Sequence, residues 1–205
     1  ITRRNILEQQ QTIMMSELDH RVKNNIAAVM SLVGLSQQGA RSIEEFAKTL
    51  DGRLHALAVA HSTLAKSHWK GVWMRDILLL TLQPYMVGTI ERIRFDGPDV
   101  ELPGTLARPM CMVIHELATN ATKYGALSSD DGFIVVTTDV QSKDGSIQLT
   151  WAESDGPTIS SEITEGTGTS LLQGLVDHEM HGKIAMNYAS EGLVCQIEVP
   201  LDTNS

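Results

Sequence analysis

The feature that most constrains the fold is a long segment without helix breakers at the start of the chain. Residues 5–38 contain no proline and a single glycine, Gly34, so they can form one continuous helix. Apolar residues recur there at spacings of four and three, which is typical of a helix with one apolar stripe: Leu18, Val22, Ile26, Val29 and Val33. The sequence therefore predicts a long amphipathic helix.

A second amphipathic helix is predicted after a short turn that contains Gly39. Ser42, followed three residues later by Glu45, forms the capping-box pattern that opens a helix. Apolar residues then recur again at helical spacing: Ile43, Phe46, Leu50, Leu54, Leu57 and Leu64. Two such helices make a hairpin, which has too little core to be stable alone. We therefore expect it to pair with a second hairpin or to dock on the rest of the chain.

From Lys70 and Gly71 onward the pattern changes to mixed helices and strands. The predicted helices cover residues 74–86, 105–123 and 170–180, and the predicted strands cover 92–95, 100–102, 133–140, 147–151, 183–188 and 193–199. A segment rich in Gly, Ser and Thr, residues 154–169, is predicted to be a flexible loop. The predicted fold class is α+β, with a helical hairpin in residues 1–70 and an α/β sandwich with a mixed sheet in residues 71–205.

Composition and charge restrict the functions open to the chain. The net charge of −9 argues against a nucleic-acid binder, because neutralising phosphates needs clustered Lys and Arg. No run approaches the roughly 18 apolar residues of a membrane span, and the start lacks a signal-peptide pattern, so we expect this piece to be cytoplasmic. Cys111 and Cys195 lack metal-ligand spacing and are expected to be buried thiols in a reducing compartment.

His20 is the first candidate for chemistry. With a helical step of roughly 100° per residue, it falls about 160° from the middle of the apolar stripe and is expected to point to solvent. Glu17 and Asn24 lie one turn before and after it on the same face. A neutral imidazole presented in this way can attack a phosphoryl group when an acceptor holds its other nitrogen. A lone surface histidine usually has no such role, so the residues around His20 must show whether it accepts a phosphoryl group.

A second constellation occupies residues 115–127, which read His-Glu-Leu-Ala-Thr-Asn-Ala-Thr-Lys-Tyr-Gly-Ala-Leu. On a helix, Glu116, Asn120 and Lys123 fall on one face. An amide oxygen suits Mg²⁺, and a lysine one turn further on can contact phosphate oxygens. The polar face of an ordinary amphipathic helix would explain this spacing. It would not explain why His-Glu, Asn-Ala and Lys-Tyr-Gly occur together in one segment.

Two further segments can contribute to the same site. Residues 149–157, Leu-Thr-Trp-Ala-Glu-Ser-Asp-Gly-Pro, carry Trp151 and Glu153 at the end of a predicted strand, although many strands end in a polar turn. Residues 166–170, Gly-Thr-Gly-Thr-Ser, open a predicted helix, where small residues let backbone N–H groups approach phosphates. The second pattern is weak alone and is not a Walker loop, because no Gly-Lys-Ser/Thr follows.

Together these segments resemble the HWE-type histidine kinases. The run at residues 17–25, Glu-Leu-Asp-His-Arg-Val-Lys-Asn-Asn, closely resembles their phosphoacceptor box. Residues 53–57, 60–61 and 69–72 are similar to their second hairpin helix and its exit, and the resemblance continues to Leu201. It implies that the α/β sandwich is a Bergerat (GHKL) ATP-binding fold, with the helices on one face of the sheet.

The resemblance also implies roles for individual residues. His20 becomes the phosphoacceptor, and Asn120 becomes the ligand of a Mg²⁺ ion bound with ATP. Glu153 takes the place of the acid that receives a hydrogen bond from the adenine amino group. Relatives commonly have two glycines before the proline, so Asp155 is a second candidate for facing the base. The full implied ATP-binding set is His115, Glu116, Asn120, Lys123, Tyr124, Trp151, Glu153, Asp155, Gly156, Gly166, Gly168, Thr169 and Ser170.

The resemblance implies an ATP-dependent histidine kinase that passes the phosphoryl group from His20 to an Asp of a response regulator. Asp19 and Glu17 are the candidates for activating His20, because Arg21 follows it where many other kinases have an acid. A homodimer formed through the hairpin is expected. Residues 1–4 resemble the end of a PAS-type sensor domain. The alternatives are a phosphotransfer or scaffold module without ATP turnover, and another GHKL enzyme such as a chaperone-like ATPase or a serine kinase.

Overall fold

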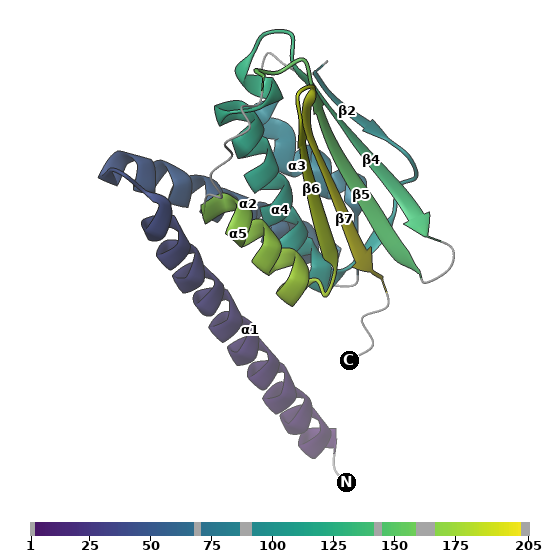
Figure 1. Cartoon of the computed structure of the whole chain (residues 1–205). Helices are drawn as coiled ribbons and strands as arrows, with labels where there is room; N and C mark the ends of the chain where they lie inside the picture. The colour runs from purple at the N-terminus through teal and green to yellow at the C-terminus, as the bar shows by residue number, and fades with distance from the viewer. Residues whose placement is uncertain (1–2, 68–70, 87–91, 142–144, 159–166, 202–205) are drawn as a thin grey trace. The chain divides into compact units, whose positions relative to one another are not determined.

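The computed structural model describes residues 3–67, 71–86, 92–141, 145–158 and 167–201 (Figure 1). The chain divides into two compact units, Ile1–Leu50 and Asp51–Ser205. The predicted domain boundary near residue 70 stays a prediction. No helix among the described residues combines the length and the apolar character that crossing a membrane requires.

The first unit holds α1 (Arg3–Gly39) and the start of α2 (Ile43–Lys66), at the positions the sequence predicts. Ser42 caps the helix as predicted, because the Glu45 N–H donates to Ser42 Oγ at 3.1 Å. The Glu45 Oε2 accepts from the Arg41 N–H at 3.0 Å, one residue before the Ser42 N–H that a capping box uses. On the predicted apolar stripe, Val22 and Ile26 are 53% and 55% exposed. An exposed stripe of this kind is typical of a surface that binds a partner.

The second unit contains a five-stranded mixed sheet in the order β2-β4-β5-β7-β6. Its strands are β2 (Ile93–Asp96), β4 (Phe133–Gln141), β5 (Ser146–Ser154), β6 (Lys183–Ala189) and β7 (Gly192–Pro200). Strand β2 is parallel to β4, and the other pairs are antiparallel. A separate two-stranded sheet pairs β1 (Gly71–Trp73) with β3 (Glu101–Pro103); the sequence did not predict β1.

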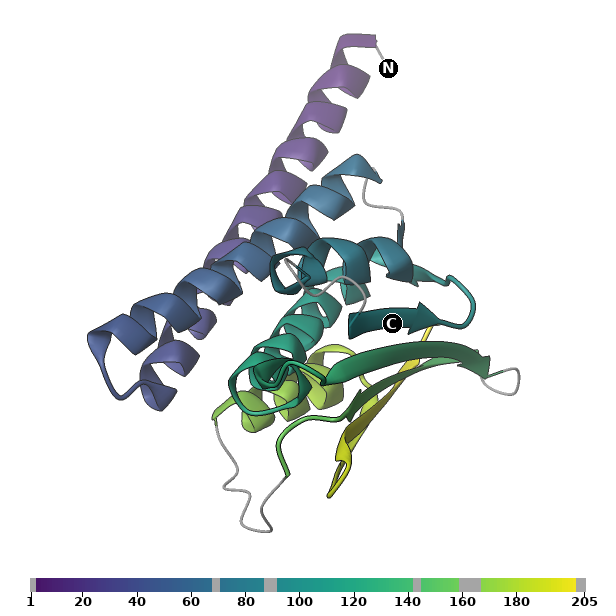
Figure 2. The same cartoon turned by 90° about the horizontal axis from the view of Figure 1, so that it is seen from above.

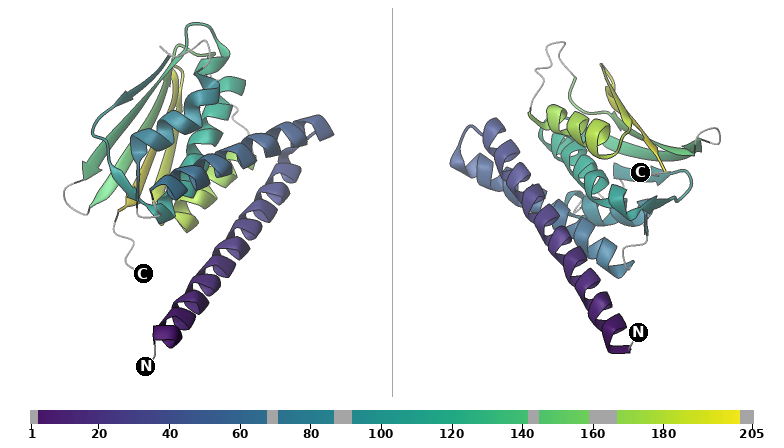
Figure 3. Two further views of the ribbon diagram at one scale, coloured as in Figure 1. Left: turned by 180° about the vertical axis from the view of Figure 1, so that it is seen from behind. Right: turned by 90° about the horizontal axis from the view of Figure 1, so that it is seen from below.

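Three helices cover one face of this sheet: α3 (Met74–Leu82), α4 (Gly104–Lys123) and α5 (Thr167–Gly174) (Figures 1 and 2). The views from behind and below show the same layering (Figure 3). The predicted α+β class, with a mixed sheet and helices on one face, is confirmed. Helix α3 ends earlier than predicted, in a 3₁₀ turn at Gln83–Tyr85, because Pro84 has no N–H with which to continue the hydrogen bonding of the helix.

Helix α4 lies at the centre of the core, since Met110, Ile114 and Leu117 have no exposed surface. It therefore forms a rigid support for the polar residues of its second half. Cys111 and Cys195 are buried free thiols, as predicted. Burial raises the pKa of the Cys111 thiol to about 11 and that of Cys195 to about 12.

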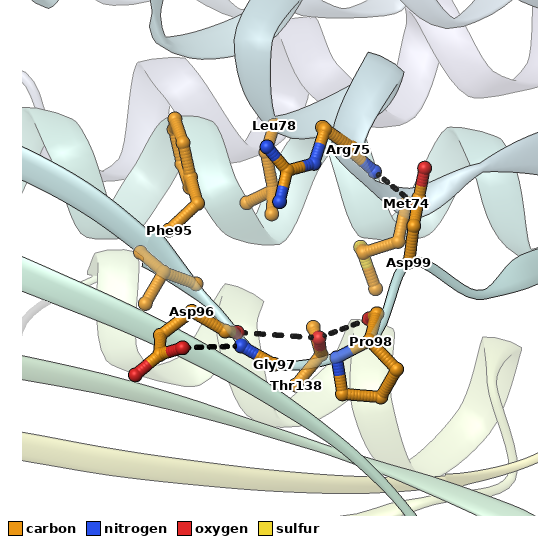
Figure 4. A pocket seen from close by; sticks show the side chains of 10 residues that line it. Met74, Arg75, Leu78, Phe95, Asp96, Gly97, Pro98, Asp99 and Thr138 are labelled. Atoms are coloured by element: carbon orange, nitrogen blue, oxygen red, sulfur yellow. Dashed lines mark hydrogen bonds between the residues drawn. The ribbon is translucent and has the colours of Figure 1, made fainter.

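A small hollow between α3, β2 and β4 belongs to this framework (Figure 4). The Thr138 hydroxyl donates to the Pro98 carbonyl at 2.6 Å, and the Arg75 N–H donates to Asp99 Oδ1 at 3.0 Å in the first turn of α3. Gly97 has a φ of 91° there, a conformation that favours glycine. The hollow measures about 10 Å³, room for one water at most.

Candidate active site

The second half of α4 brings two predicted site residues next to the start of α5. Glu116 is buried and Asn120 half-buried, one turn apart on α4. Gly168 lies over both: a Cβ there would be 3.4 Å from Glu116 Oε2 and 3.7 Å from the Asn120 Oδ1 and Nδ2 atoms. Two segments that the sequence singled out separately are therefore adjacent.

The remaining predicted residues near this point differ in exposure. Thr169 is half-buried and Ser170 is exposed at the start of α5, and Gly166 lies outside the described residues. Lys123 and Tyr124 are exposed where α4 ends, Tyr124 to 72%. Exposed side chains at a helix end can turn toward a ligand, so their ATP-binding roles stay predictions.

Glu116 is held by Arg53, a residue of α2 within the second unit. The Arg53 Nε donates to Glu116 Oε1 at 2.7 Å, and its Nη2 donates to Glu116 Oε2 at 3.2 Å. The Arg53 and Glu116 side chains are only 3% and 7% exposed. Sequence analysis did not assign a role to Arg53. Its position three residues after Leu50 and four before Leu57, on the apolar face of α2, is the signal that it is buried.

The His115 ring faces a different set of groups. The Tyr85 hydroxyl lies 2.8 Å from His115 Nδ1 and 2.9 Å from the Thr119 hydroxyl. Burial lowers the pKa of His115, because an imidazolium is poorly solvated there, and burial raises the pKa of Tyr85. A cavity of about 260 Å³, bordered by α2 residues including Gly52 and by Tyr85, opens beside the ring.

Glu153 connects the end of β5 to the loop that follows α4 by hydrogen bonds. Its Oε1 accepts from Trp151 Nε1 at 3.0 Å, and its Oε2 accepts from the Ala126 N–H at 2.8 Å. Burial raises the pKa of Glu153, and these two hydrogen bonds partly oppose that rise. Each carboxylate oxygen can still accept a second hydrogen bond, so the predicted contact with an adenine amino group stays a prediction.

Asp155 occupies a backbone conformation that glycine adopts at lower cost. Its φ is 55°, in the left-handed region that Asp tolerates better than most residues. The side chain is exposed. Next to it, Gly156 lies against the turn after α4, since a Cβ there would be 2.9 Å from Ala126 Cα. This backbone geometry suits glycine, the residue that the resemblance implies at position 155.

Arg92 is a second arginine that sequence analysis missed. Its guanidinium donates to the carbonyl of Gly132 at 2.6 Å, to that of Ala126 at 3.0 Å, and to that of Ser129. It therefore ties together the loop that Glu153 holds from the other side. Because backbone carbonyls are the partners, no motif marks this role in the sequence.

The phosphoacceptor-like run lies on α1. Asp19 and Lys23 form an exposed ion pair of 2.6 Å, and Asn24 is exposed. The side chains of Glu17 and His20 lie outside the described residues. The helical backbone at position 20 matches the prediction, and the solvent-facing direction of the imidazole stays a prediction.

The described residues contain no group of three His, Cys, Asp or Glu side chains placed to hold a metal ion. Mg²⁺ usually binds through few protein ligands together with phosphate oxygens. The Asn120 amide, half-buried and next to Gly168, carries the oxygen that suits such an ion.

The chain is similar in sequence to known histidine kinases. The HWE histidine kinase family matches residues 17–99. Blue-light-activated histidine kinase 1 of Erythrobacter litoralis is 35% identical over 191 residues, which are 91% of this chain and 52% of that protein. The chain belongs to the HWE histidine kinases. A blue-light-activated histidine kinase of Brucella ovis is 30% identical over 203 residues, which are 98% of this chain and 42% of that protein.

A solved structure supports the fold of this HWE histidine kinase chain. The histidine kinase domain of a blue-light-activated kinase from Erythrobacter litoralis matches with a TM-score of 0.66 at 18% identity, covering 91% of this chain and 90% of that domain. The chain spans about half the length of the curated relatives it matches, 52% and 42%.

Proposed function

We propose that this chain is the kinase core of a two-component signalling protein and transfers the γ-phosphoryl group of ATP to His20. The observation that carries the proposal is the gathering of Glu116, Asn120 and Gly168. It places an amide that suits Mg²⁺ beside a glycine that leaves room for phosphates. The phosphoacceptor-like run at residues 17–25 supplies the nucleophile in the same chain.

In this proposal Asn120 holds Mg²⁺, which when bound neutralises charge on the phosphates. Lys123 contacts phosphate oxygens, and Glu153 or Asp155 accepts a hydrogen bond from the adenine amino group. The remaining residues proposed to complete the ATP site are His115, Glu116, Tyr124, Trp151, Gly156, Gly166, Gly168, Thr169 and Ser170.

The reaction is an in-line phosphoryl transfer. The unprotonated ring nitrogen of His20 forms a bond to the γ-phosphorus, the bond from phosphorus to the bridging oxygen breaks, and ADP leaves with that electron pair. The proton on the other ring nitrogen passes to an acceptor, for which Glu17 and Asp19 are the candidates. Positioning and charge neutralisation supply most of the rate in such transfers.

The phosphohistidine then passes its phosphoryl group to an Asp of a response regulator receiver domain. A PAS-like sensor domain before residue 1 is proposed to control the kinase. Two copies are proposed to pair through the hairpin, because Met30 is 70% exposed next to the apolar stripe that contains Val22 and Ile26. The buried free thiols suit a cytoplasmic location.

Incubation with γ-³²P-labelled ATP and Mg²⁺ tests the proposal. We expect the chain to acquire label that acid removes and base leaves intact, as for a phosphorylated histidine. His20→Ala abolishes the label, whereas His178→Ala, a change of an exposed histidine in the second unit, leaves it unchanged. A matched His→Ala control shows that losing an imidazole is not enough by itself.

The two alternative functions give different results in the same assay. Acid-stable label that persists in His20→Ala indicates a serine kinase, and ATP hydrolysis without any label indicates another GHKL ATPase. No label from ATP, combined with acceptance of phosphoryl from a phosphorylated receiver domain, indicates a phosphotransfer module. Each of these outcomes contradicts the proposed kinase activity.

A further inference from the structure

The buried Arg53–Glu116 pair needs an explanation beyond stability. Its two side chains are 3% and 7% exposed and meet through two hydrogen bonds of 2.7 and 3.2 Å. Removing two charges from water costs about as much as their attraction returns, so apolar side chains often serve equally well at such positions. The place of the pair within the site therefore bears on its role.

The pair lies where the phosphates of a nucleotide are proposed to bind. Glu116 precedes the Mg²⁺-binding candidate Asn120 by one helical turn. Its Oε2 atom, which accepts from Arg53, is also the atom that a Cβ at Gly168 would approach to 3.4 Å. Without Arg53, a buried carboxylate with no compensating positive charge would stand beside a strongly negative triphosphate, in surroundings that screen charge poorly.

The neighbouring residue shows that α2 is fitted closely to this part of α4. A Cβ at Gly52 would lie 2.9 Å from the His115 ring, so only glycine allows this approach. Gly52 and Arg53 thus meet His115 and Glu116 as consecutive residues of two helices. This close packing brings the backbone of α2 near α4 at Arg53, so that the guanidinium reaches Glu116.

We propose that Arg53 is a positioning residue of the nucleotide site. It orients and neutralises Glu116, so that the phosphate end of the nucleotide meets Asn120 and the start of α5 beside a neutral pair. The inference rests on the proposed function, because it takes the nucleotide to bind at Asn120 and Gly168. It also gives a residue of the hairpin's second helix a part in nucleotide binding.

The test compares binding of ATP, ADP and adenosine, each with Mg²⁺, by isothermal titration calorimetry on the full 205-residue chain. In Arg53→Gln the dissociation constant for ATP is expected to rise about tenfold, because the bare carboxylate repels the phosphates. The dissociation constant for ADP is expected to rise by a smaller factor. Adenosine, which has no phosphate, is expected to bind as tightly as it does to the parent chain. A merely structural role of Arg53 would weaken all three ligands equally.

The double variant Arg53→Gln/Glu116→Gln separates charge from shape. Because both charges are removed, the repulsion of the phosphates is removed too, and the double variant is expected to bind ATP more tightly than Arg53→Gln does. Arg108→Gln is the matched control, since Arg108 forms a 2.7 Å pair with Glu179 in the same unit but is 39% exposed. It is expected to leave all three dissociation constants unchanged.

Three results would overturn the role of Arg53: no loss of ATP binding in Arg53→Gln, an equal loss for adenosine, or no recovery in the double variant. If Arg53→Gln does not fold by circular dichroism, the double variant and Arg53→Lys carry the test. Arg53→Lys keeps the positive charge but cannot donate both hydrogen bonds in the bidentate geometry of arginine. It is expected to retain the preference of the parent chain for ATP over adenosine, and loss of that preference would overturn the inference. Failure of the proposed function is a separate result, in which the parent chain binds no ATP.

Discussion

Replacing Gly125 by alanine tests how closely the loop after α4 lies against Glu153. A Cβ at Gly125 would fall 3.0 Å from the Glu153 carboxyl carbon and 3.0 Å from Ala121 Cα, and closer still to Glu153 Oε2. The backbone φ of Gly125 is −108°, which alanine adopts freely. The cost of the substitution is therefore steric and does not come from backbone strain.

The magnitude follows from two contributions. Forcing a methyl group into a packed site costs about 1–3 kcal/mol. Moving the Glu153 carboxylate to make room also threatens its 2.8 Å hydrogen bond from the Ala126 N–H, and a buried donor left without a partner costs about 1–3 kcal/mol. We expect Gly125→Ala to lower the free energy of unfolding by about 2–4 kcal/mol.

Urea denaturation followed by the fluorescence of the fully buried Trp151 measures this change. Gly174→Ala is the matched control, because nothing lies within 4 Å of its added Cβ and its φ of −61° is helical. That variant is expected to gain about 0.5–1 kcal/mol from alanine's higher helix propensity. If Gly125→Ala were as stable as the parent chain, the close approach to Glu153 would be refuted.

Substitutions at three further positions test the same region by urea denaturation. Glu153→Gln is expected to remove a pH dependence of the free energy of unfolding. At pH values between the ordinary pKa of 4.5 and the raised pKa of Glu153, the folded parent chain binds more protons than the unfolded chain. The free energy of unfolding of the parent chain therefore falls, relative to that of the variant, as the pH rises through this window. Equal pH profiles would contradict the shift. Arg92→Met is expected to lose about 2–4 kcal/mol with its carbonyl contacts, and a loss under 1 kcal/mol would contradict their importance. Asp155→Gly is expected to gain up to about 1 kcal/mol because φ is 55°, and Asp155→Val to lose stability; the opposite order would contradict the left-handed backbone.

The sequence predicted the long elements of the fold because their patterns are strong. Helix α4 was expected over residues 105–123 and covers Gly104–Lys123, since its run of apolar residues is buried in the core. Strand β1 was missed because its three residues, Gly71–Trp73, lie directly before a helix with no turn signal between them. Its partner Glu101–Pro103 is remote in the chain, so the pairing arises only from tertiary structure.

The sequence predicted the motif residues of the candidate site, but not the arginines that hold those residues and their loops in place. Glu116 and Asn120 were recognisable because their spacing places them on one helical face. Arg53 was not, because its partner is 63 residues away and a single sequence carries no sign of such a distant contact. Arg92 was missed because it holds carbonyl groups, which every residue has. The direction of the His115 ring, toward Tyr85, also depends on packing between elements that are far apart in the chain.

The ion pair bears on where the nucleotide-binding part of the molecule begins. The change from a purely helical to a mixed pattern placed that boundary near Gly71, whereas the second compact unit begins at Asp51. A fragment that starts at Gly71 would lack Arg53, leaving the Glu116 carboxylate without the two hydrogen bonds that the guanidinium donates. Since an unpaired buried charge is costly, such a fragment is expected to expose Glu116 to water. The second half of α2 therefore serves two purposes, as part of the hairpin that the sequence predicts and as a source of positive charge for the site on α4.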